Sequence, residues 1–129
     1  MQRFSNKGFS LVELMLVVAI ISIVIAIAVP TIVSARIEAQ VQATHATVRT
    51  IYTAEMIYYI RTGSFTTIPT LGAQKILDNR FNDDPMEMSG YSISLIVTDG
   101  GLGFLCTAMP YNLRAPIMVV DEDGFIEMH

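Results

Sequence analysis

The sequence predicts an α+β roll in which a long N-terminal helix packs under a small antiparallel sheet. Residues 9–60 contain one proline and no glycine, and apolar residues recur at helical spacing in their second half. Residues 91–128 instead form short apolar runs separated by turns rich in glycine, proline and aspartate. The chain has 129 residues, which is enough for one globular core but not for two.

The composition excludes several classes of function. The chain is 52% hydrophobic with a net charge of −4, so no nucleic-acid partner is predicted. A single cysteine and two histidines rule out an intrachain disulfide and a Cys/His zinc site. No nucleophile, base and orienting group occur in a recognisable pattern. We therefore expect no enzymatic activity, no metal and no cofactor.

An uncharged segment near the N-terminus is long enough to cross a membrane. Residues 14–35 are 22 residues without a charge, about 33 Å as a helix at ~1.5 Å per residue, against roughly 30 Å of bilayer hydrocarbon. Arg3 and Lys7 precede it and should stay in the cytoplasm. The residues after the segment are then expected outside the membrane.

A cleaved secretory signal is the alternative interpretation of this segment. Residues 26–28 read Ala-Ile-Ala, which is an acceptable cleavage site after a basic start and an apolar core. Two features oppose a cleaved signal. The apolar run continues through Pro30 to Ala35, and Glu13 interrupts the charge-free core that such a signal should have. A charge inside a membrane segment is costly and is normally retained for a function. A retained anchor is favoured.

Residues 7–30, KGFSLVELMLVVAIISIVIAIAVP, resemble the class III signal of type IV pilins and type II secretion pseudopilins. The resemblance includes the Gly8-Phe9 junction, Glu13 four residues after Phe9, the aliphatic run and Pro30. It implies that a prepilin peptidase cleaves after Gly8 and that the new Phe9 amine is N-methylated. The chain then divides into a leader (1–8), a transmembrane and assembly helix (9–35) and a globular domain (36–129).

Cleavage after Gly8 changes the charges at the N-terminus. Loss of Arg3 and Lys7 leaves six basic against twelve acidic side chains, a net side-chain charge of −6. The new amine lies near the membrane surface, with Glu13 about 6 Å further along the helix. Glu13 can neutralise its own Phe9 amine or that of a neighbouring subunit. The resemblance implies the neighbour, with Glu13 driving recruitment and setting the axial register.

Pro30 lacks a backbone N–H and clashes with the carbonyl of Ala26 four residues earlier. We therefore expect weakened hydrogen bonding over residues 22–30 and a kink at Pro30. Filaments of the pilin family lose helicity just before this proline, which allows them to extend. A kinked helix and a locally unwound helix both predict a bend there.

The elements after Pro30 follow from periodicity and turn signals. An apolar stripe on the helix up to residue 60 is interrupted by Thr44 and Glu55 and comprises Ile37, Val41, Val48, Ile51 and Tyr58. A short helix capped by Thr70 is expected over residues 70–81. Strands are expected over residues 91–98, 103–109, 117–120 and 125–128.

Parts of the globular region also resemble one group of short bacterial pilins. The similar segments are residues 46–65, Gly90-Tyr91, residues 108–110 and residues 121–126. Many pilins close a C-terminal loop with two cysteines, whereas this chain has only Cys106. A receptor-binding role based on such a loop is therefore not implied.

Three further features have a simple structural interpretation. Residues 121–124, Asp-Glu-Asp-Gly, lack the ligand spacing of an EF-hand, so a hairpin turn is favoured over a calcium site. Aromatic residues between positions 52 and 65 are expected to pack under the sheet or between subunits rather than to conduct electrons. His45 is expected on the polar side of the helix, and Cys106 in the core.

The predicted function is that of a structural prepilin of a type IV pilus (fimbrium), which polymerises through its N-terminal helix. The alternatives are a type II secretion pseudopilin and, less favoured, a membrane-anchored binding domain that forms no polymer. Predicted partners are other copies of the chain, other pilins, prepilin peptidase and the pilus or secretion machinery. The precursor is expected in the bacterial inner membrane, and the assembled form in a surface pilus or a periplasmic pseudopilus.

Overall fold

The computed structural model describes residues 8–129, which form two compact units that divide after Arg36. Helix α1 (Leu11–Thr62) continues from the first unit into the second. It begins and ends two residues later than the predicted range of 9–60. It begins at Leu11 because Ser10 caps its first turn, and it ends before Gly63, which has a φ of 78°.

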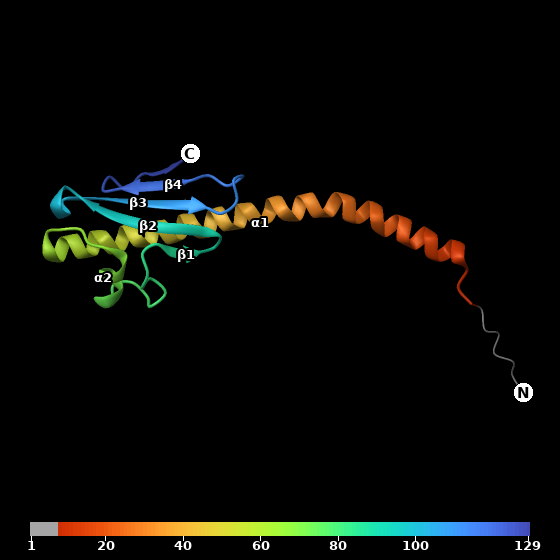
Figure 1. The fold of residues 1–129 in the computed structure, drawn as a ribbon, viewed down its shortest axis with the longest axis horizontal. Coiled ribbons are helices and arrows are strands. Elements are labelled where there is room, and N and C mark those ends of the chain that lie inside the picture. The colour runs from red at the N-terminus through yellow and green to blue at the C-terminus, as the bar shows by residue number, and fades with distance from the viewer. Residues whose placement is uncertain (1–7) are drawn as a thin grey trace, which may run out of the picture. The chain divides into compact units, whose positions relative to one another are not determined.

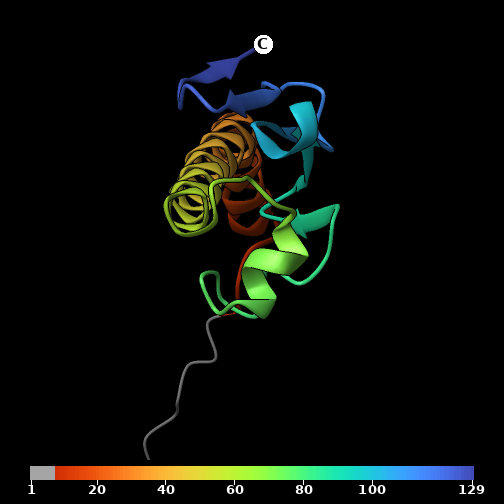
Figure 2. The ribbon, with the colours of Figure 1, turned by 90° about the vertical axis from the view of Figure 1, so that its left-hand side faces the viewer.

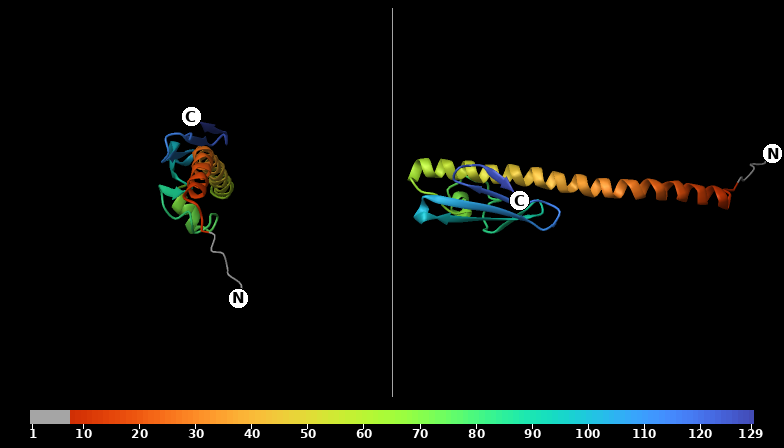
Figure 3. Two further views of the ribbon diagram at one scale, coloured as in Figure 1. Left: turned by 90° about the vertical axis from the view of Figure 1, so that its right-hand side faces the viewer. Right: turned by 90° about the horizontal axis from the view of Figure 1, so that it is seen from above.

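The second unit contains a five-stranded antiparallel sheet whose strands follow one another in chain order (Figure 1). The strands are β1 (Met86–Met88), β2 (Tyr91–Thr98), β3 (Gly103–Pro110), β4 (Met118–Asp121) and β5 (Ile126–Met128). They run alongside the part of α1 that belongs to this unit (Figure 3). The predicted α+β class, a long helix with a small antiparallel sheet, is confirmed.

Most strand predictions are close to the observed bounds. Strand β2 has the predicted range, and its turn is a 3₁₀ segment, η1 (Asp99–Gly101). Strand β3 includes Pro110, at which it was expected to stop, while β4 and β5 each begin one residue later than predicted. Strand β1 was not predicted, because it has only three residues and follows Pro85. Its pairing with β2, from Met86 opposite Ile93, defines it as a strand.

The predicted helix over residues 70–81 is wrong in both its bounds and its cap. Helix α2 (Ile68–Ala73) has only six residues, and its N-cap is Thr67. Pro69 lies in the first turn, where its missing N–H has no cost and its fixed φ favours a helix start. Lys75 adopts a positive φ of 58°, so the chain turns away where the sequence pattern suggested that the helix continues.

The core lies between α1 and the inner face of the sheet, with the sheet on one side of the helix (Figure 2). Each fully buried aliphatic or aromatic side chain contributes about 1.5–3 kcal/mol. The predicted stripe on α1 faces this core, although Ile37 and Tyr58 are only partly buried. Its two exceptions, Thr44 and Glu55, are fully buried as well. The sheet contributes Tyr91, Ile93, Leu95, Phe104, Cys106, Ala108, Met118 and Val120.

Aromatic rings link α1 to the sheet. Phe65 stacks on Tyr59 with ring centroids 4.6 Å apart and lies 4.9 Å from Phe104, which in turn lies 6.2 Å from Tyr52. These contacts are the packing under the sheet that was expected for this group, and Cys106 is fully buried in the core, as predicted.

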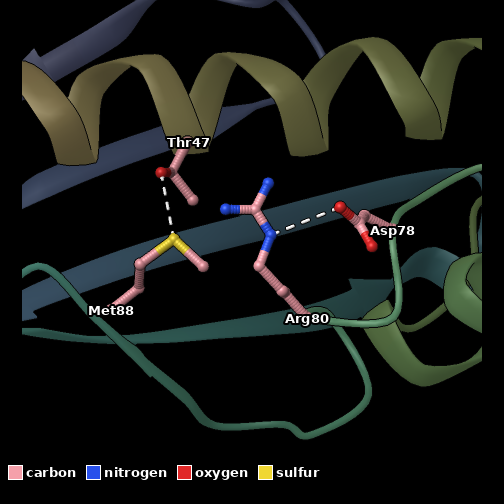
Figure 4. A network of polar contacts seen from close by, with 4 residues as sticks. All are labelled: Thr47, Asp78, Arg80 and Met88. Carbon is pink, nitrogen blue, oxygen red and sulfur yellow. Dashed lines mark hydrogen bonds and ion pairs between the residues drawn. The ribbon is translucent and has the colours of Figure 1, made fainter.

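Polar contacts near β1 add little to stability. The hydroxyl of Thr47 on α1 lies 3.5 Å from the sulfur of Met88 on β1 (Figure 4). Arg80 and Asp78 form an ion pair at 3.3 Å in the segment between α2 and β1, but both side chains are largely exposed. An exposed pair of this kind contributes at most about 1 kcal/mol.

Candidate processing and assembly site

The predicted cleavage junction lies just before α1 in the chain. Gly8, Phe9 and Ser10 have no regular secondary structure and are exposed. A Cβ atom added at Gly8 would meet nothing within 4 Å. A protease needs its scissile peptide in an accessible, non-helical segment, and the Gly8–Phe9 bond meets that requirement. Arg3 and Lys7, the predicted cytoplasmic charges, lie outside the described residues.

Ser10 and Glu13 form a reciprocal pair of hydrogen bonds at the start of α1. The backbone N–H of Ser10 donates to Oε2 of Glu13 at 2.9 Å, and the backbone N–H of Glu13 donates to Oγ of Ser10 at 3.4 Å. This arrangement is a capping box, which satisfies N–H groups that have no partner inside the helix. The sequence analysis missed the role of Ser10, although the Ser-x-x-Glu spacing is its known signal.

Glu13 therefore has a local function that depends on its own subunit. Its carboxylate lies at the positive end of the helix dipole, where a negative charge is favourable. The structure brings Glu13 close to Ser10 in the same chain and shows that the carboxylate is exposed at the end of α1. The predicted partner, the Phe9 amine of another subunit, stays a prediction.

The N-terminal segment matches a known protein family. A model described as the prokaryotic N-terminal methylation motif matches residues 3–29. Residues 3–29 are a class III signal. The same motif marks type IV pilins and pseudopilins, and its presence at the N-terminus supports a pilin-like precursor. No curated protein and no solved structure matches the chain.

The N-terminal half of α1 has the length and the apolar composition of a membrane anchor. Helix α1 contains a window long and apolar enough to span a bilayer, and none of that window is buried in the structure. The hydroxyls of Ser22, Thr31 and Ser34 each donate to the carbonyl four residues earlier, at 2.7, 3.2 and 3.1 Å. These polar groups are thus satisfied within the helix, as lipid requires.

Pro30 lies inside α1, and the helix is continuous through it. The proline has no N–H to donate to the carbonyl of Ala26, so one bond of the helical ladder is missing there. The predicted kink at Pro30, and its role in filament extension, stay predictions.

Two shallow cavities lie between α1 and the C-terminal hairpin of the second unit. One has a volume of about 270 Å³ and is lined by residues that include His45, Arg49 and Tyr52. The other, of about 400 Å³, is lined by residues that include His45 and Arg114. His45 is half-buried and lines both cavities, next to polar residues of α1 that include Glu38 and Arg49. Across residues 8–129, no three His, Cys, Asp or Glu side chains gather to hold a metal ion.

The Asp121–Gly124 segment forms the hairpin turn between β4 and β5. Oδ1 of Asp121 accepts the backbone N–H of Asp123 at 3.1 Å, and its carbonyl accepts the N–H of Gly124 at 3.1 Å. The favoured interpretation of this acidic segment as a turn agrees with these bonds.

Proposed function

We propose that this pilin-like precursor is a structural subunit of a type IV pilus, rather than an enzyme. Prepilin peptidase hydrolyses the Gly8–Phe9 bond, the new Phe9 amine is N-methylated, and the mature subunit leaves the inner membrane to join a helical filament. The observation that carries the proposal is the uncovered apolar surface of α1, which is attached to a class III signal.

The first part of this surface is the anchor itself. Large apolar side chains from Leu14 to Val33 are exposed, including Leu16, Ile23, Ile27 and Ile32, each at 61% or more. Lipid covers this surface in the membrane. Once the subunit is extracted, other apolar helices must cover it, because contiguous apolar patches of this size are not stable in water.

The second part is a stripe on the outward face of α1 in the second unit, here called the outer stripe. Its seven residues are all exposed and alternate in steps of four and three: Ala39, Ala43, Ala46, Thr50, Thr53, Ile57 and Ile60. This spacing is that of a helix–helix packing seam, and the stripe contains no charge. Its small residues allow a second helix to approach closely.

The threonines of the outer stripe support this interpretation. The hydroxyl of Thr50 donates to the carbonyl of Ala46, and that of Thr53 to the carbonyl of Arg49, both at 2.9 Å. Each threonine therefore satisfies its hydroxyl on its own helix, so that the hydroxyl needs no partner from a second helix. The outer stripe is thus more apolar than its two threonines suggest, because their hydroxyls are already bonded within the helix.

A type II secretion pseudopilus is the second candidate. Its subunits use the same signal and the same helix-driven assembly, and its filament stays in the periplasm. We favour the surface pilus because residues 121–124 lack the ligand spacing of a calcium loop, which some secretion pseudopilins carry. Other pilins, prepilin peptidase and the assembly machinery are the proposed partners in either case.

The test is mass spectrometry of filaments sheared from native cells. An N-terminal peptide that begins at N-methyl-Phe9 in abundant sheared filaments supports the surface pilus. The same peptide found only in the envelope fraction supports the pseudopilus. A mature chain that begins at Val29 would contradict both, because it indicates an ordinary secretory signal.

Glu13→Ala provides the matched mutational test. We expect this variant to insert into the membrane and to assemble poorly, because the recruiting carboxylate is lost. A normal filament yield from Glu13→Ala would contradict the proposed role of Glu13.

A further inference from the structure

The turn between β3 and β4 presents a leucine and an arginine at its tip. The carbonyl of Asn112 accepts the backbone N–H of Ala115 at 3.0 Å, and Oδ1 of Asn112 accepts the backbone N–H of Arg114 at 3.0 Å. These bonds fix a tight turn whose central residues are Leu113 and Arg114. The side chain of Leu113 is 99% exposed, the largest exposed fraction among the large apolar side chains of residues 8–129. The turn thus holds Leu113 away from the core.

The neighbours of Leu113 in the chain suit a phospholipid surface. Met109 at the end of β3 and Tyr111 are both more than half exposed. Tyrosine is enriched where a membrane meets water, because its ring is apolar and its hydroxyl is polar. Arg114 forms no ion pair within residues 8–129, and a guanidinium group can bind a phosphate through two hydrogen bonds. The turn therefore combines an apolar tip with groups that bind lipid headgroups.

Chain connectivity places this turn close to the membrane. Arg114 and Pro116 line the larger cavity together with residues of α1 that include Ile37 and Glu38. Ile37 stands two residues after the uncharged segment of residues 14–35. The headgroup layer on each side of a bilayer is about 5–8 Å thick, which a helix crosses in roughly four or five residues. The part of α1 beside Arg114 is therefore the part that crosses the headgroup layer.

We propose that the turn of residues 111–114 docks on the phospholipid surface while the subunit is anchored in the membrane. Leu113 enters the edge of the acyl layer, Tyr111 lies among the headgroups, and the guanidinium of Arg114 binds a lipid phosphate. This inference rests on the membrane anchor and not on the choice between a pilus and a pseudopilus. Extraction of the subunit then has to release this second contact as well as the anchor.

Apolar contact supplies most of the attraction. The chain is acidic as a whole, so an anionic surface gains only the local attraction of Arg114. Leu113 gains more, because docking removes its exposed apolar surface from water. The two bonds of Asn112 already fix the turn, so little conformational entropy is lost on contact. We therefore expect docking on zwitterionic bilayers as well as on anionic ones.

The chain contains no tryptophan, so a single introduced tryptophan reports on one position. Leu113→Trp reports on the turn, and Ile23→Trp reports on the anchor. Leu102→Trp is the matched control, because Leu102 is also an exposed leucine and precedes β3, whereas Leu113 follows it. Each full-length variant is reconstituted at low density into phosphatidylcholine bilayers with or without brominated acyl chains, which quench a tryptophan that touches them.

We expect the emission of Leu113→Trp and of Ile23→Trp to be blue-shifted and to be quenched by the brominated lipid. The emission of Leu102→Trp should show neither effect. Adding Arg114→Gln to Leu113→Trp should lower the ratio of docked to undocked turns about fivefold on phosphatidylglycerol bilayers, the effect of one basic side chain at an anionic surface. An unchanged ratio would refute the contact between Arg114 and a phosphate.

The other outcomes separate a failure of docking from a failure of the anchor. Unquenched Leu113→Trp together with quenched Ile23→Trp would refute docking and leave the anchor intact. Blue-shifted emission of Leu113→Trp without quenching would also overturn docking, because it shows that a second copy covers the turn. Equal quenching of Leu102→Trp would show that the turn is no specific site. Unquenched Ile23→Trp would refute the anchor and the docking with it, and none of these results depends on filament formation.

Discussion

The carboxyl group of Glu55 accepts a hydrogen bond from the backbone N–H of Thr66 at 3.1 Å, which ties the end of α1 to the segment leading into α2. Glu55 is fully buried, and its second oxygen, Oε1, has no hydrogen-bond partner among residues 8–129. Burial raises the pKa of this carboxyl to about 7, and the bond from Thr66 offsets part of that rise. The core of the second unit therefore contains a group that titrates near neutral pH.

Glu55 makes the stability of the fold depend on pH. Because its pKa is higher in the folded chain than in the unfolded chain, the folded state binds more protons between pH 4.5 and about 7. The free energy of unfolding should therefore fall as the pH rises through this range. Burial also raises the pKa of Asp84, which acts in the same direction. Urea unfolding of the processed protein in detergent, at pH values from 5 to 8, measures this trend.

The variant Glu55→Gln should flatten that pH profile. At pH 8 it should be more stable than wild type by on the order of 1–3 kcal/mol, because no charge remains in the core. Asp84→Asn is the control and should leave most of the slope. A wild-type free energy of unfolding that rises from pH 5 to 8 would contradict a raised pKa of Glu55 in the folded protein.

Gly8 should tolerate alanine but not a bulky charged residue. Space around Gly8 is open, so a substitution there does not disturb the fold of residues 8–129. Gly8→Ala should be largely processed, and Gly8→Arg should accumulate as precursor, because the peptidase has to accommodate the side chain next to the scissile bond. Gel separation of precursor and mature forms measures the outcome. Equal processing of both variants would contradict recognition at Gly8.

Gly124 should be the least replaceable glycine of the hairpin turns. It has a φ of 79°, and a Cβ atom there would lie 2.6 Å from the ring of Tyr52. Gly124→Ala should cost about 2–4 kcal/mol of unfolding free energy, from backbone strain and from displacement of the ring. Gly100→Ala is the matched control, because Gly100 also has a positive φ, of 65°, but open space around it. Its cost should be near 1 kcal/mol. Equal losses in the two variants would show that the contact with Tyr52 has no effect.

A charge on the outer stripe should prevent assembly without unfolding the protein. Ala46→Glu places a carboxylate in the proposed helix-packing seam, where burial without a partner is unfavourable. Gln74→Glu adds the same charge at an exposed position outside α1. We expect both variants to unfold within about 0.5 kcal/mol of wild type. Only Ala46→Glu should give few filaments by electron microscopy, and equal filament yields would contradict the proposed seam.

The sequence by itself was sufficient for features that depend on local patterns. The apolar anchor, the long helix, strand β2 and the class III signal each follow from spacing within a few turns or residues. The capping box was also readable, since Ser10 and Glu13 stand at the required separation, although it was missed. These features rely on interactions between near neighbours in the chain, so their signals are present in the order of residues.

Only the tertiary structure decided how distant segments meet. Glu55 and Thr44 interrupt the apolar stripe in the sequence, yet both are fully buried because the sheet covers that side of α1. Residues 86–88 form strand β1 only because they pair with β2. Gly124 has no room for a side chain because the ring of Tyr52, more than seventy residues earlier, lies against it. The physical reason is that burial, strand pairing and close approach are set by contacts between segments far apart in the chain, and no local pattern encodes them.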